Sequence, residues 1–252
     1  MNLECNAADQ QQKFHSRADL DRFSNRWNNP YIRKRELRMA DKILEKMPLG
    51  GKKILEIGCG EGTNLLYLND RNSDVKYTGI DFSKEKIESF QGFPENIRGI
   101  IADATALPFA DNEFDLVFIR DVLHHIDWAR QKVMDEAWRV LGKGGTLLIF
   151  EGNPFAPLNV IFRVLYPVEK GMKNSTLKKM LELLNQYATC TVEYLEPGYL
   201  VRGISFVVWK SKSRNILGRC LLPLADIAER FLCIIPRRFW TGRLYFIKKE
   251  SN

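Results

Sequence analysis

Short apolar runs alternate with stretches of helical periodicity through the middle of the chain. Residues 53–57 and 75–80 are apolar runs typical of buried parallel strands, and residues 63–68 between them have helical spacing. More runs of strand length follow, at 97–101, 114–119 and 146–151. This alternation predicts an α/β fold built on a doubly wound, mostly parallel sheet.

The flanks of this central region carry their own patterns. An apolar stripe predicts a helix over 31–46, with Pro30 suited to its first turn, so we expect an N-terminal helical cap at 1–47. Residues 48–252 then form the main domain. Its later part is expected to contain a helix at 175–187, a sixth strand at 190–195 and a last strand at 243–248, with 197–242 as a lid-like, largely helical insertion before that strand.

Glycines and acidic residues stand where two of the predicted strands end. Gly58, Gly60 and Gly62 follow the first strand directly, with Glu56 inside the strand end, and Asp81 ends the second strand. Glycine lets a backbone turn tightly and approach a ligand without a Cβ in the way. A carboxylate at the end of the second strand is placed to accept the hydroxyls of a ribose. The pattern therefore predicts a nucleoside-containing ligand.

The run Glu56-Ile57-Gly58-Cys59-Gly60-Glu61-Gly62 resembles the first motif of class I S-adenosylmethionine (SAM) methyltransferases, in particular the small-molecule enzymes of the type 11 kind. Segments at 77–83, 101–109, 114–126 and 140–149 resemble the later motifs of the family in the right order, so the resemblance covers about 52–153. It implies a Rossmann-like sheet of seven strands with the last one antiparallel. It also implies SAM as the cofactor and S-adenosylhomocysteine (SAH) as the product.

The same resemblance assigns roles to individual residues. It places Glu56 near the SAM ammonium group, Asp81 on the ribose, and Asp103 with the Ala104 N–H on the adenine edge. Arg120 and Asp121 are expected to border the cofactor. The full set of expected cofactor contacts is Glu56, Gly58, Cys59, Gly60, Asp81, Phe82, Asp103, Ala104, Arg120 and Asp121.

Two adjacent histidines are the candidates for acid–base chemistry. His124 and His125 follow the fourth predicted strand, at the sheet edge where ligands bind in open α/β folds. Histidine is the natural base for an acceptor that must lose a proton, and the resemblance favours His125 over His124. A packing role for His125 is the alternative. No Cys/His spacing typical of a metal site is present, so we expect no metal.

Composition and charge refine this picture. The five cysteines are widely spaced and show no CxxC pair, and no signal segment or run of 18 apolar residues is visible, so we expect a cytoplasmic protein. The net charge of +7 is uneven: residues 1–53 carry +5, residues 54–153 carry −7 and residues 154–252 carry +9. The basic flanks suit an anionic partner, although a solvated basic face is the simpler interpretation.

The acceptor is left open by the motifs. The apolar and basic insertion favours a hydrophobic or lipid-linked small molecule, with peripheral contact to an anionic membrane at its inner face. A soluble metabolite, such as a sugar or natural-product intermediate, is the alternative. Protein or nucleic-acid substrates are disfavoured, because Ile119-Arg120-Asp121-Val122 replaces the NPPY-like tetrad, so we expect no nucleic-acid partner. Oligomeric state and the choice among O-, N- and C-methylation stay undetermined.

Overall fold

The structure is a computed structural model of the chain. The structure describes residues 23, 26–28, 30–48, 50–194, 200, 221, 223–225, 227–229 and 231–251. Within those residues, no helix is both long and apolar enough to cross a membrane.

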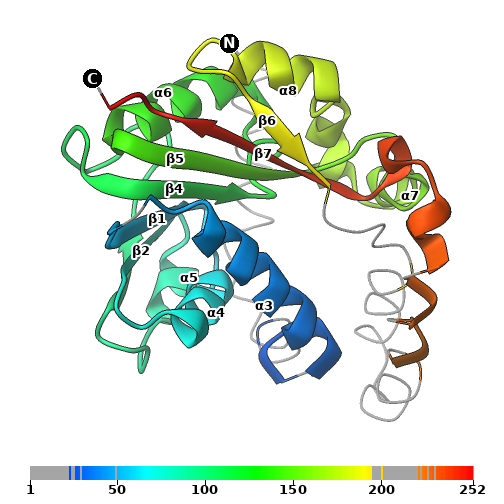
Figure 1. The fold of residues 1–252 in the computed structure, drawn as a ribbon, viewed down its shortest axis with the longest axis horizontal. Helices are drawn as coiled ribbons and strands as arrows, with labels where there is room; N and C mark the ends of the chain where they lie inside the picture. The colour runs from blue at the N-terminus through cyan, green and yellow to red at the C-terminus, as the bar shows by residue number, and fades with distance from the viewer. Residues whose placement is uncertain are drawn as a thin grey trace.

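A single mixed sheet of seven strands forms the centre of the molecule (Figure 1). Its order is β3-β2-β1-β4-β5-β7-β6. The strands are β1 Lys53–Ile57, β2 Lys76–Asp81, β3 Ile97–Ile101, β4 Phe114–Arg120, β5 Leu141–Gly152, β6 Thr191–Glu193 and β7 Gly242–Lys248. Strands β1 to β5 pair in parallel, and β7 pairs antiparallel with both β5 and β6. The predicted Rossmann-like fold with an antiparallel last strand is confirmed.

Helices cover both faces of the sheet and enclose a separate apolar core on each (Figure 1). The helices are α3 Pro30–Glu45, α4 Thr63–Arg71, α5 Lys84–Glu88, α6 Arg130–Val140, α7 Pro157–Leu165 and α8 Leu177–Leu184, with short 3₁₀ segments η1 Asp127–Ala129, η2 Pro167–Asn174, η3 Leu232–Ile234 and η4 Arg237–Phe239. Helices α6 and α8 pack on one face through Val133, Met134 and Met180. Helices α3 and α4 pack on the other through Ile43 and Leu65.

Three element boundaries differ from the sequence-based predictions. Strand β5 begins at Leu141 rather than at residue 146, because Leu141 already pairs with Phe114 of β4. The sequence also predicts a helix at 128–141 that begins with Asp127 as its cap. In the structure this stretch splits into η1 and α6, and Asp127 pairs with Arg130 at 2.8 Å instead of capping α6. Strand β6 is shorter than 190–195.

The order of the strands reverses between β1 and β4, which both pair in parallel. A ligand site in an open α/β sheet lies outside the carboxyl ends of the strands at such a point. The N-terminal helix α3 packs against α4 beside this edge. The predicted insertion at 197–242 falls mostly outside the described residues, so its helical character stays a prediction.

Candidate active site

The glycine turn after β1 is held against the end of β2. The Gly58 and Cys59 N–H groups donate to the Ile80 carbonyl at 2.8 and 2.9 Å. Gly58 has φ +73°, and a Cβ there would meet the Val122 side chain at 2.4 Å. Gly60 has φ +56°, but a Cβ there would meet no atom within 4 Å, so the turn borders open space at Gly60. The backbone at Gly60 is therefore accessible to a ligand.

The Cys59 side chain serves the core rather than the site. It is 6% exposed and belongs to the apolar cluster beneath α4. A Cβ at Gly79 would lie 2.7 Å from the Cys59 sulfur, so the two strand ends meet closely there. Burial raises the pKa of the Cys59 thiol well above its usual range. Cys59 can contribute its backbone to a ligand, but its thiol is not a nucleophile.

Asp81 lies where β1 and β2 end together. Its carboxylate accepts the Gly60 N–H at 3.0 Å and the Ser83 N–H at 2.9 Å. Burial raises its pKa, with Lys86 and the two N–H groups acting in the opposite direction. Each carboxylate oxygen has a second lone pair, so the group can still accept the hydroxyls of a ribose.

The segment after β3 lies next to Asp81. The Ala102 N–H donates to the Asp81 carbonyl at 3.1 Å. Asp103 is exposed and its carboxylate accepts the Thr105 N–H at 2.8 Å, while Ala104 is half-buried. Phe82, the residue after Asp81, is 44% exposed. These expected cofactor contacts are thus brought to one stretch of the sheet edge.

Glu56 is a buried carboxyl group in an unusual state. It is 1% exposed, and its Oε1 accepts a hydrogen bond from the Asn64 amide. Its Oε2 is buried and has no hydrogen-bond partner among the described residues. Burial raises the pKa of Glu56 to about 8, although Asn64, Arg120 and Arg26 favour the ionised form. Glu56 therefore holds a proton near neutral pH until a cation approaches.

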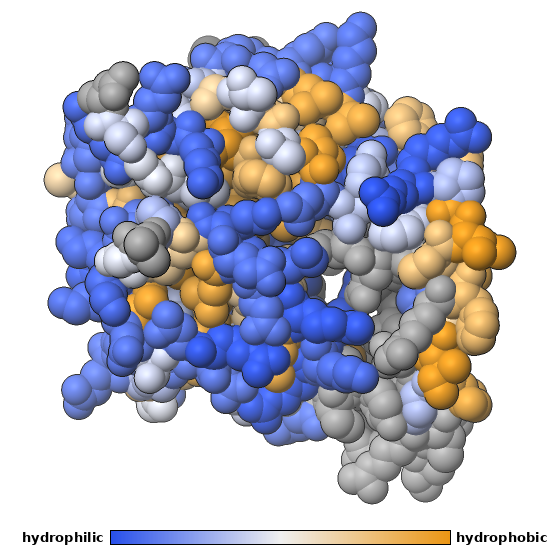
Figure 2. All heavy atoms as spheres, viewed as in Figure 1, coloured by the Kyte–Doolittle hydropathy of each residue, from blue (hydrophilic) through white to orange (hydrophobic). Residues whose placement is uncertain are grey.

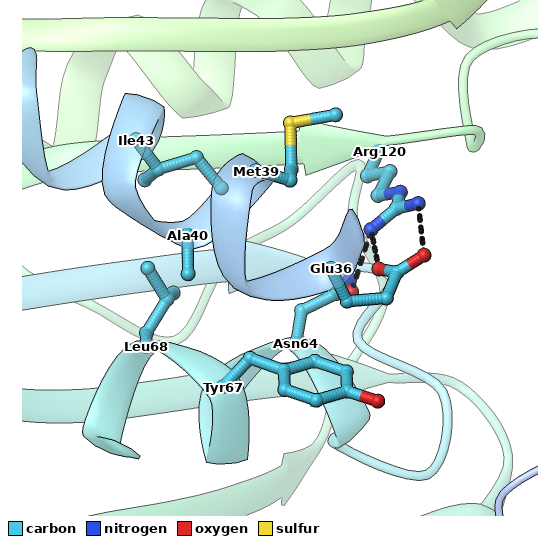
Figure 3. Close-up of a pocket in the computed structure, with 8 residues that line it drawn as sticks. All are labelled: Glu36, Met39, Ala40, Ile43, Asn64, Tyr67, Leu68 and Arg120. Atoms are coloured by element: carbon cyan, nitrogen blue, oxygen red, sulfur yellow. Dashed lines mark hydrogen bonds and ion pairs between the residues drawn. The ribbon is translucent and has the colours of Figure 1, made fainter. Parts of the chain in front are cut away.

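A charged cluster links this carboxyl group to the N-terminal helix. The Arg120 guanidinium faces the Glu36 carboxylate with a two-pronged contact, and it also donates to Asn64 Oδ1 at 3.0 Å (Figure 3). Arg26 donates to the same Glu36 carboxylate at 3.0 Å. Burial raises the pKa of Glu36, but Arg120 and Arg26 together lower it by more. The net pKa therefore lies far below the usual range. Helix α3 is thereby fastened to the ends of β1 and β4.

The crevice behind this cluster is not a substrate pocket. It lies between α3 and α4 and is too narrow to hold water. Its lining residues are Glu36, Met39, Ala40, Ile43, Asn64, Tyr67, Leu68 and Arg120 (Figure 3).

The loop after β4 carries the remaining predicted residues. Asp121 has φ +52°, a conformation uncommon for a residue with a Cβ, and its N–H donates to the Phe150 carbonyl at 2.9 Å. Its carboxylate lies 3.9 Å from the Arg120 guanidinium. Asp121 is half-buried. The left-handed turn lies where the chain leaves β4 toward the two histidines.

His124 lies between two carboxylates. Its Nδ1 is 2.8 Å from Glu151 and its Nε2 is 3.1 Å from Glu169. Burial lowers its pKa, but the two carboxylates outweigh burial and raise it to about 10. A histidine with both nitrogens engaged and a proton already bound cannot take another proton from an acceptor. The structure therefore does not support His124 as a general base.

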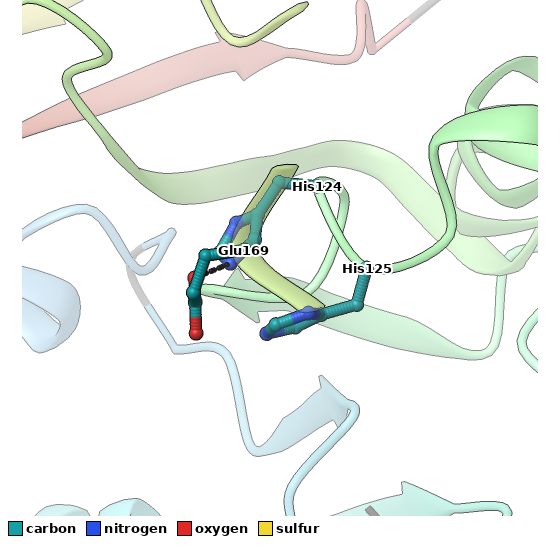
Figure 4. A group of neighbouring side chains, drawn as sticks. All are labelled: His124, His125 and Glu169. Atoms are coloured by element: carbon teal, nitrogen blue, oxygen red, sulfur yellow. Dashed lines mark ion pairs between the residues drawn. The ribbon is translucent and has the colours of Figure 1, made fainter. Parts of the chain in front are cut away.

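His125 differs in its surroundings although it is the next residue. It is half-buried, and its ring centroid lies 4.0 Å from that of His124. Figure 4 shows the rings of His124 and His125 and the Glu169 carboxylate grouped in one space. His125 is thus the better candidate of the two for a base.

Several residues of this site carry no motif and were missed by the sequence reasoning. They are Arg26, Glu36, Asn64, Glu151, Glu169 and Ser175. Asn64 and Glu151 stood close to recognised segments, and a polar residue inside a predicted buried element was the available signal. Glu36 and Glu169 lie far along the chain from their partners and gave no such signal.

Comparison with known proteins identifies the family. A family model described as a methyltransferase domain matches residues 55–149. The O-methyltransferase rstn1 of Aspergillus nomiae is 31% identical over 156 residues, which cover 57% of this chain and 68% of that protein. The chain belongs to the class I SAM-dependent methyltransferases. The motif-based prediction of this family is confirmed, and SAM is the cofactor of the family.

Other relatives extend the picture of this methyltransferase. The demethylmenaquinone methyltransferase of Thermus thermophilus is 34% identical over 52% of this chain and 59% of its own length. The chain spans about half the length of the curated relatives it matches, rstn1 aside. Among solved structures, plantazolicin methyltransferase BpumL in complex with SAH has a TM-score of 0.62 at 17% identity, covering 99% of this chain and 97% of that one. That likeness shows the fold.

The residues at the sheet edge fit SAM. The buried Oε2 of Glu56 has no partner among the described residues and suits the ammonium group of the methionine arm. The open side of Gly60 leaves room for that arm to pass. Asp81 has the acceptor capacity that two ribose hydroxyls need.

Proposed function

We propose that this methyltransferase transfers a methyl group from SAM to a small apolar or lipid-linked acceptor. The cofactor part of the proposal rests on the family and on the sheet edge. The acceptor part rests on one observation, an exposed apolar surface with basic residues beside the same edge. The demethylmenaquinone enzyme among the relatives supports a small-molecule acceptor.

Each edge residue has a role in holding the cofactor. Glu56 ionises when the ammonium group arrives and pairs with it. Asp81 accepts the ribose hydroxyls, and Asp103 with the Ala104 N–H contacts the adenine. SAM is already activated by its sulfonium, so these contacts act mainly by aligning the methyl group with the acceptor.

His125 is the residue that takes a proton from an acceptor hydroxyl or amine. His124 and its two carboxylates hold the loop that presents His125. Substitution His125→Gln should lower turnover about 100-fold while SAH affinity stays unchanged. Unchanged turnover in this variant would instead leave alignment alone as the source of rate enhancement.

An exposed apolar surface lies beside the carboxyl edge of β5; we call it the apolar flank. Helix α7 follows β5 directly, and the Asn159 amide on it donates to the Thr241 carbonyl at 2.7 Å, which joins α7 to the chain before β7. Figure 2 shows apolar side chains gathered on this side of the molecule. The apolar flank consists of Phe155, Ile161, Val164, Leu165, Leu224, Ile227, Phe231 and Ile234, which are between 53% and 89% exposed.

Basic residues accompany the apolar flank. Arg237 and Arg238 are exposed in η4, and Lys170 and Lys173 are exposed in η2. Apolar side chains that enter a bilayer beside basic side chains are typical of peripheral membrane binding. Each basic residue near an anionic bilayer adds about 1 kcal/mol, screened by salt. The flank therefore suits an anionic lipid surface from which an apolar acceptor enters the site.

Vesicle binding tests the membrane part of this proposal. The protein should sediment with vesicles of phosphatidylcholine and phosphatidylserine, and binding should fall as salt rises. Both Ile234→Asp and Arg237→Glu should weaken it. Lys143→Glu, an exposed change at the amino end of β5, is the matched control and should matter less. Wild-type protein that ignores anionic vesicles at low salt would favour the soluble-metabolite alternative.

Methyl transfer itself is tested with isotopically labelled SAM. The protein is incubated with labelled SAM and either a lipid extract or an aqueous metabolite extract. Label should appear in the lipid extract and should be lost with His125→Gln. Label only in the aqueous fraction would keep the methyltransferase and change the acceptor class.

A further inference from the structure

Three side chains with metal-ligating atoms meet on the acceptor side of the site. His124, His125 and Glu169 each offer one ligand atom, and these atoms all lie within 4.8 Å of one another (Figure 4). The histidines come from the loop after β4, and Glu169 comes from η2. Two segments that are far apart in the sequence therefore bring three ligand side chains into one small volume.

A second layer of hydrogen bonds fixes the orientation of His124. Glu151 lies 2.8 Å from His124 Nδ1, which directs Nε2 toward Glu169. Glu151 is itself fixed by the Leu123 N–H at 2.9 Å and by the Ser175 hydroxyl at 3.1 Å. A carboxylate that binds the far nitrogen of a histidine is the usual support of a metal-ligating imidazole.

The segment that carries Glu169 is held against the histidine loop. A Cβ at Gly171 would lie 1.8 Å from the His124 carbonyl oxygen, so only glycine permits this approach. Arg130 donates to the Gly171 carbonyl at 3.2 Å and to the Leu123 carbonyl at 3.1 Å, which ties the two segments together. The close placement of Glu169 and His124 is thus built into the backbone.

We propose that His124 Nε2, His125 and Glu169 form a binding site for a divalent transition metal ion such as Zn²⁺. Two imidazoles and one carboxylate are a donor set that suits Zn²⁺, Co²⁺ and Fe²⁺ rather than Mg²⁺ or Ca²⁺. Glu151 and Glu169 place two negative charges around His124, and the nearby Asp127 and Arg130 pair off at 2.8 Å. When the ion binds, it displaces the proton that His124 holds on Nε2, which is released to solvent, and the dication then balances the two carboxylates.

The geometry requires only small adjustments. Ligand atoms about 2.1 Å from a tetrahedral ion are roughly 3.3 Å from each other. His124 Nε2 and Glu169 are already 3.1 Å apart. Rotation of the half-buried His125 and Glu169 side chains can shorten the remaining distances between ligand atoms, because neither side chain is fully enclosed.

Three protein ligands leave a coordination position open. A catalytic ion of this type polarises an oxygen that binds there and lowers its pKa. This role rests on the proposed methyltransferase function and takes the place of proton abstraction by His125, whose ring is a ligand when the ion is bound, whereas metal binding itself does not rest on that function. Metal binding and a catalytic role of the metal can therefore be disproved independently.

Cobalt binding tests the site without reference to activity. The full chain is treated with chelator, dialysed and titrated with Co²⁺, and visible absorption and Zn²⁺ competition are followed. The expected result is one saturable visible band that Zn²⁺ displaces. Glu169→Gln and His125→Asn should each weaken Co²⁺ binding at least about 10-fold. Circular dichroism verifies that the variants are folded.

Glu182→Gln is the matched control. Glu182 is an exposed carboxylate of α8 outside the cluster, and this variant should bind Co²⁺ like the wild type. The absence of a band in the wild type would overturn the site and leave the cluster as a proton-bridged ion pair. A band that persists unchanged in both cluster variants would overturn it too. Retained SAH binding in either case would leave the methyltransferase proposal standing.

Discussion

Glu56 and Glu151 occupy equivalent places and behave in opposite ways. Each is the last residue but one of its strand, at the carboxyl edge of the sheet, and each is 1% exposed. Burial raises the pKa of Glu56 to about 8. Burial is the largest single influence on Glu151 too, but His124, Arg130 and Ser175 together outweigh it, and the net pKa of Glu151 is lowered.

The difference lies in the number of donors around each carboxyl group. Glu151 receives the Leu123 N–H, the Ser175 hydroxyl and the His124 ring. Among the described residues, Glu56 receives a hydrogen bond from the Asn64 amide and keeps one oxygen without a partner. A fully satisfied carboxylate is part of the scaffold, and an unsatisfied one is prepared for a ligand cation.

The largest expected effect comes from neutralising the scaffold carboxylate. Glu151→Gln leaves the His124 imidazolium with one carboxylate fewer and should lower the free energy of unfolding by about 3 kcal/mol. Glu56→Gln is the matched control, because Glu56 is already protonated at pH 7, and its stability should be equal or higher. Urea unfolding followed by circular dichroism measures both. Equal losses in the two variants would contradict the comparison.

The pH dependence of stability in the cofactor-free protein tests the raised pKa of Glu56 directly. A carboxyl whose folded pKa is raised keeps its proton in the folded state while the unfolded state has lost it. Stability therefore falls as pH rises between the unfolded pKa and the folded value of about 8, by about 1.4 kcal/mol per pH unit while the proton is held. Glu56→Gln should remove this decline between pH 5 and 6.5, below the range where the raised pKa of His124 adds a decline of its own. Saturating SAH should reduce it in the wild type, because the cofactor ammonium group stabilises ionised Glu56.

Local patterns predicted most of the sheet but not all of its boundaries. Apolar runs located β1 to β4 within one residue or so, because each is a short apolar run bounded by polar turns, and β1, β2 and β4 are almost fully buried. The start of β5 was missed because Gly142, Gly144 and Gly145 indicate a turn. That stretch is held by tertiary pairing, with Gly144 and Gly145 exchanging backbone hydrogen bonds with Lys249. Backbone pairing between distant residues leaves no trace in side-chain pattern.

Motifs predicted the cofactor edge better than the acceptor side. Asp81 and Gly60 could be predicted to lie together because their spacing within one βαβ unit is local, and the structure joins them directly. The pattern alone could not distinguish His124 from His125, because the carboxylates that separate them arrive from Glu151 and Glu169. Those contacts form only when β5 and η2 pack against the loop after β4.

A substitution in the cofactor site is expected to have a smaller effect than loss of the scaffold carboxylate Glu151. Asp81→Ala removes the acceptor of the ribose hydroxyls and should weaken SAH binding by roughly 1–3 kcal/mol. Asp74→Ala, an exposed change at the opposite end of β2, is the control and should leave binding unchanged. Isothermal calorimetry measures both. Wild-type affinity in Asp81→Ala would remove Asp81 from the cofactor site.

The smallest expected effect on stability comes from removing one of the three hydrogen-bond donors to Glu151. Ser175→Ala deletes the hydroxyl that donates to Glu151 at 3.1 Å and accepts from Arg130 at 3.0 Å, while Arg130 keeps its bond to the Gly171 carbonyl. The loss should be about 1 kcal/mol in urea unfolding, because two donors to Glu151 remain. Ser89→Ala, which removes a hydroxyl that bonds only the Lys86 carbonyl nearby in the chain, should cost less. A loss as large as that of Glu151→Gln would mean that the network around His124 fails as a unit, and that its donors cannot be counted one by one.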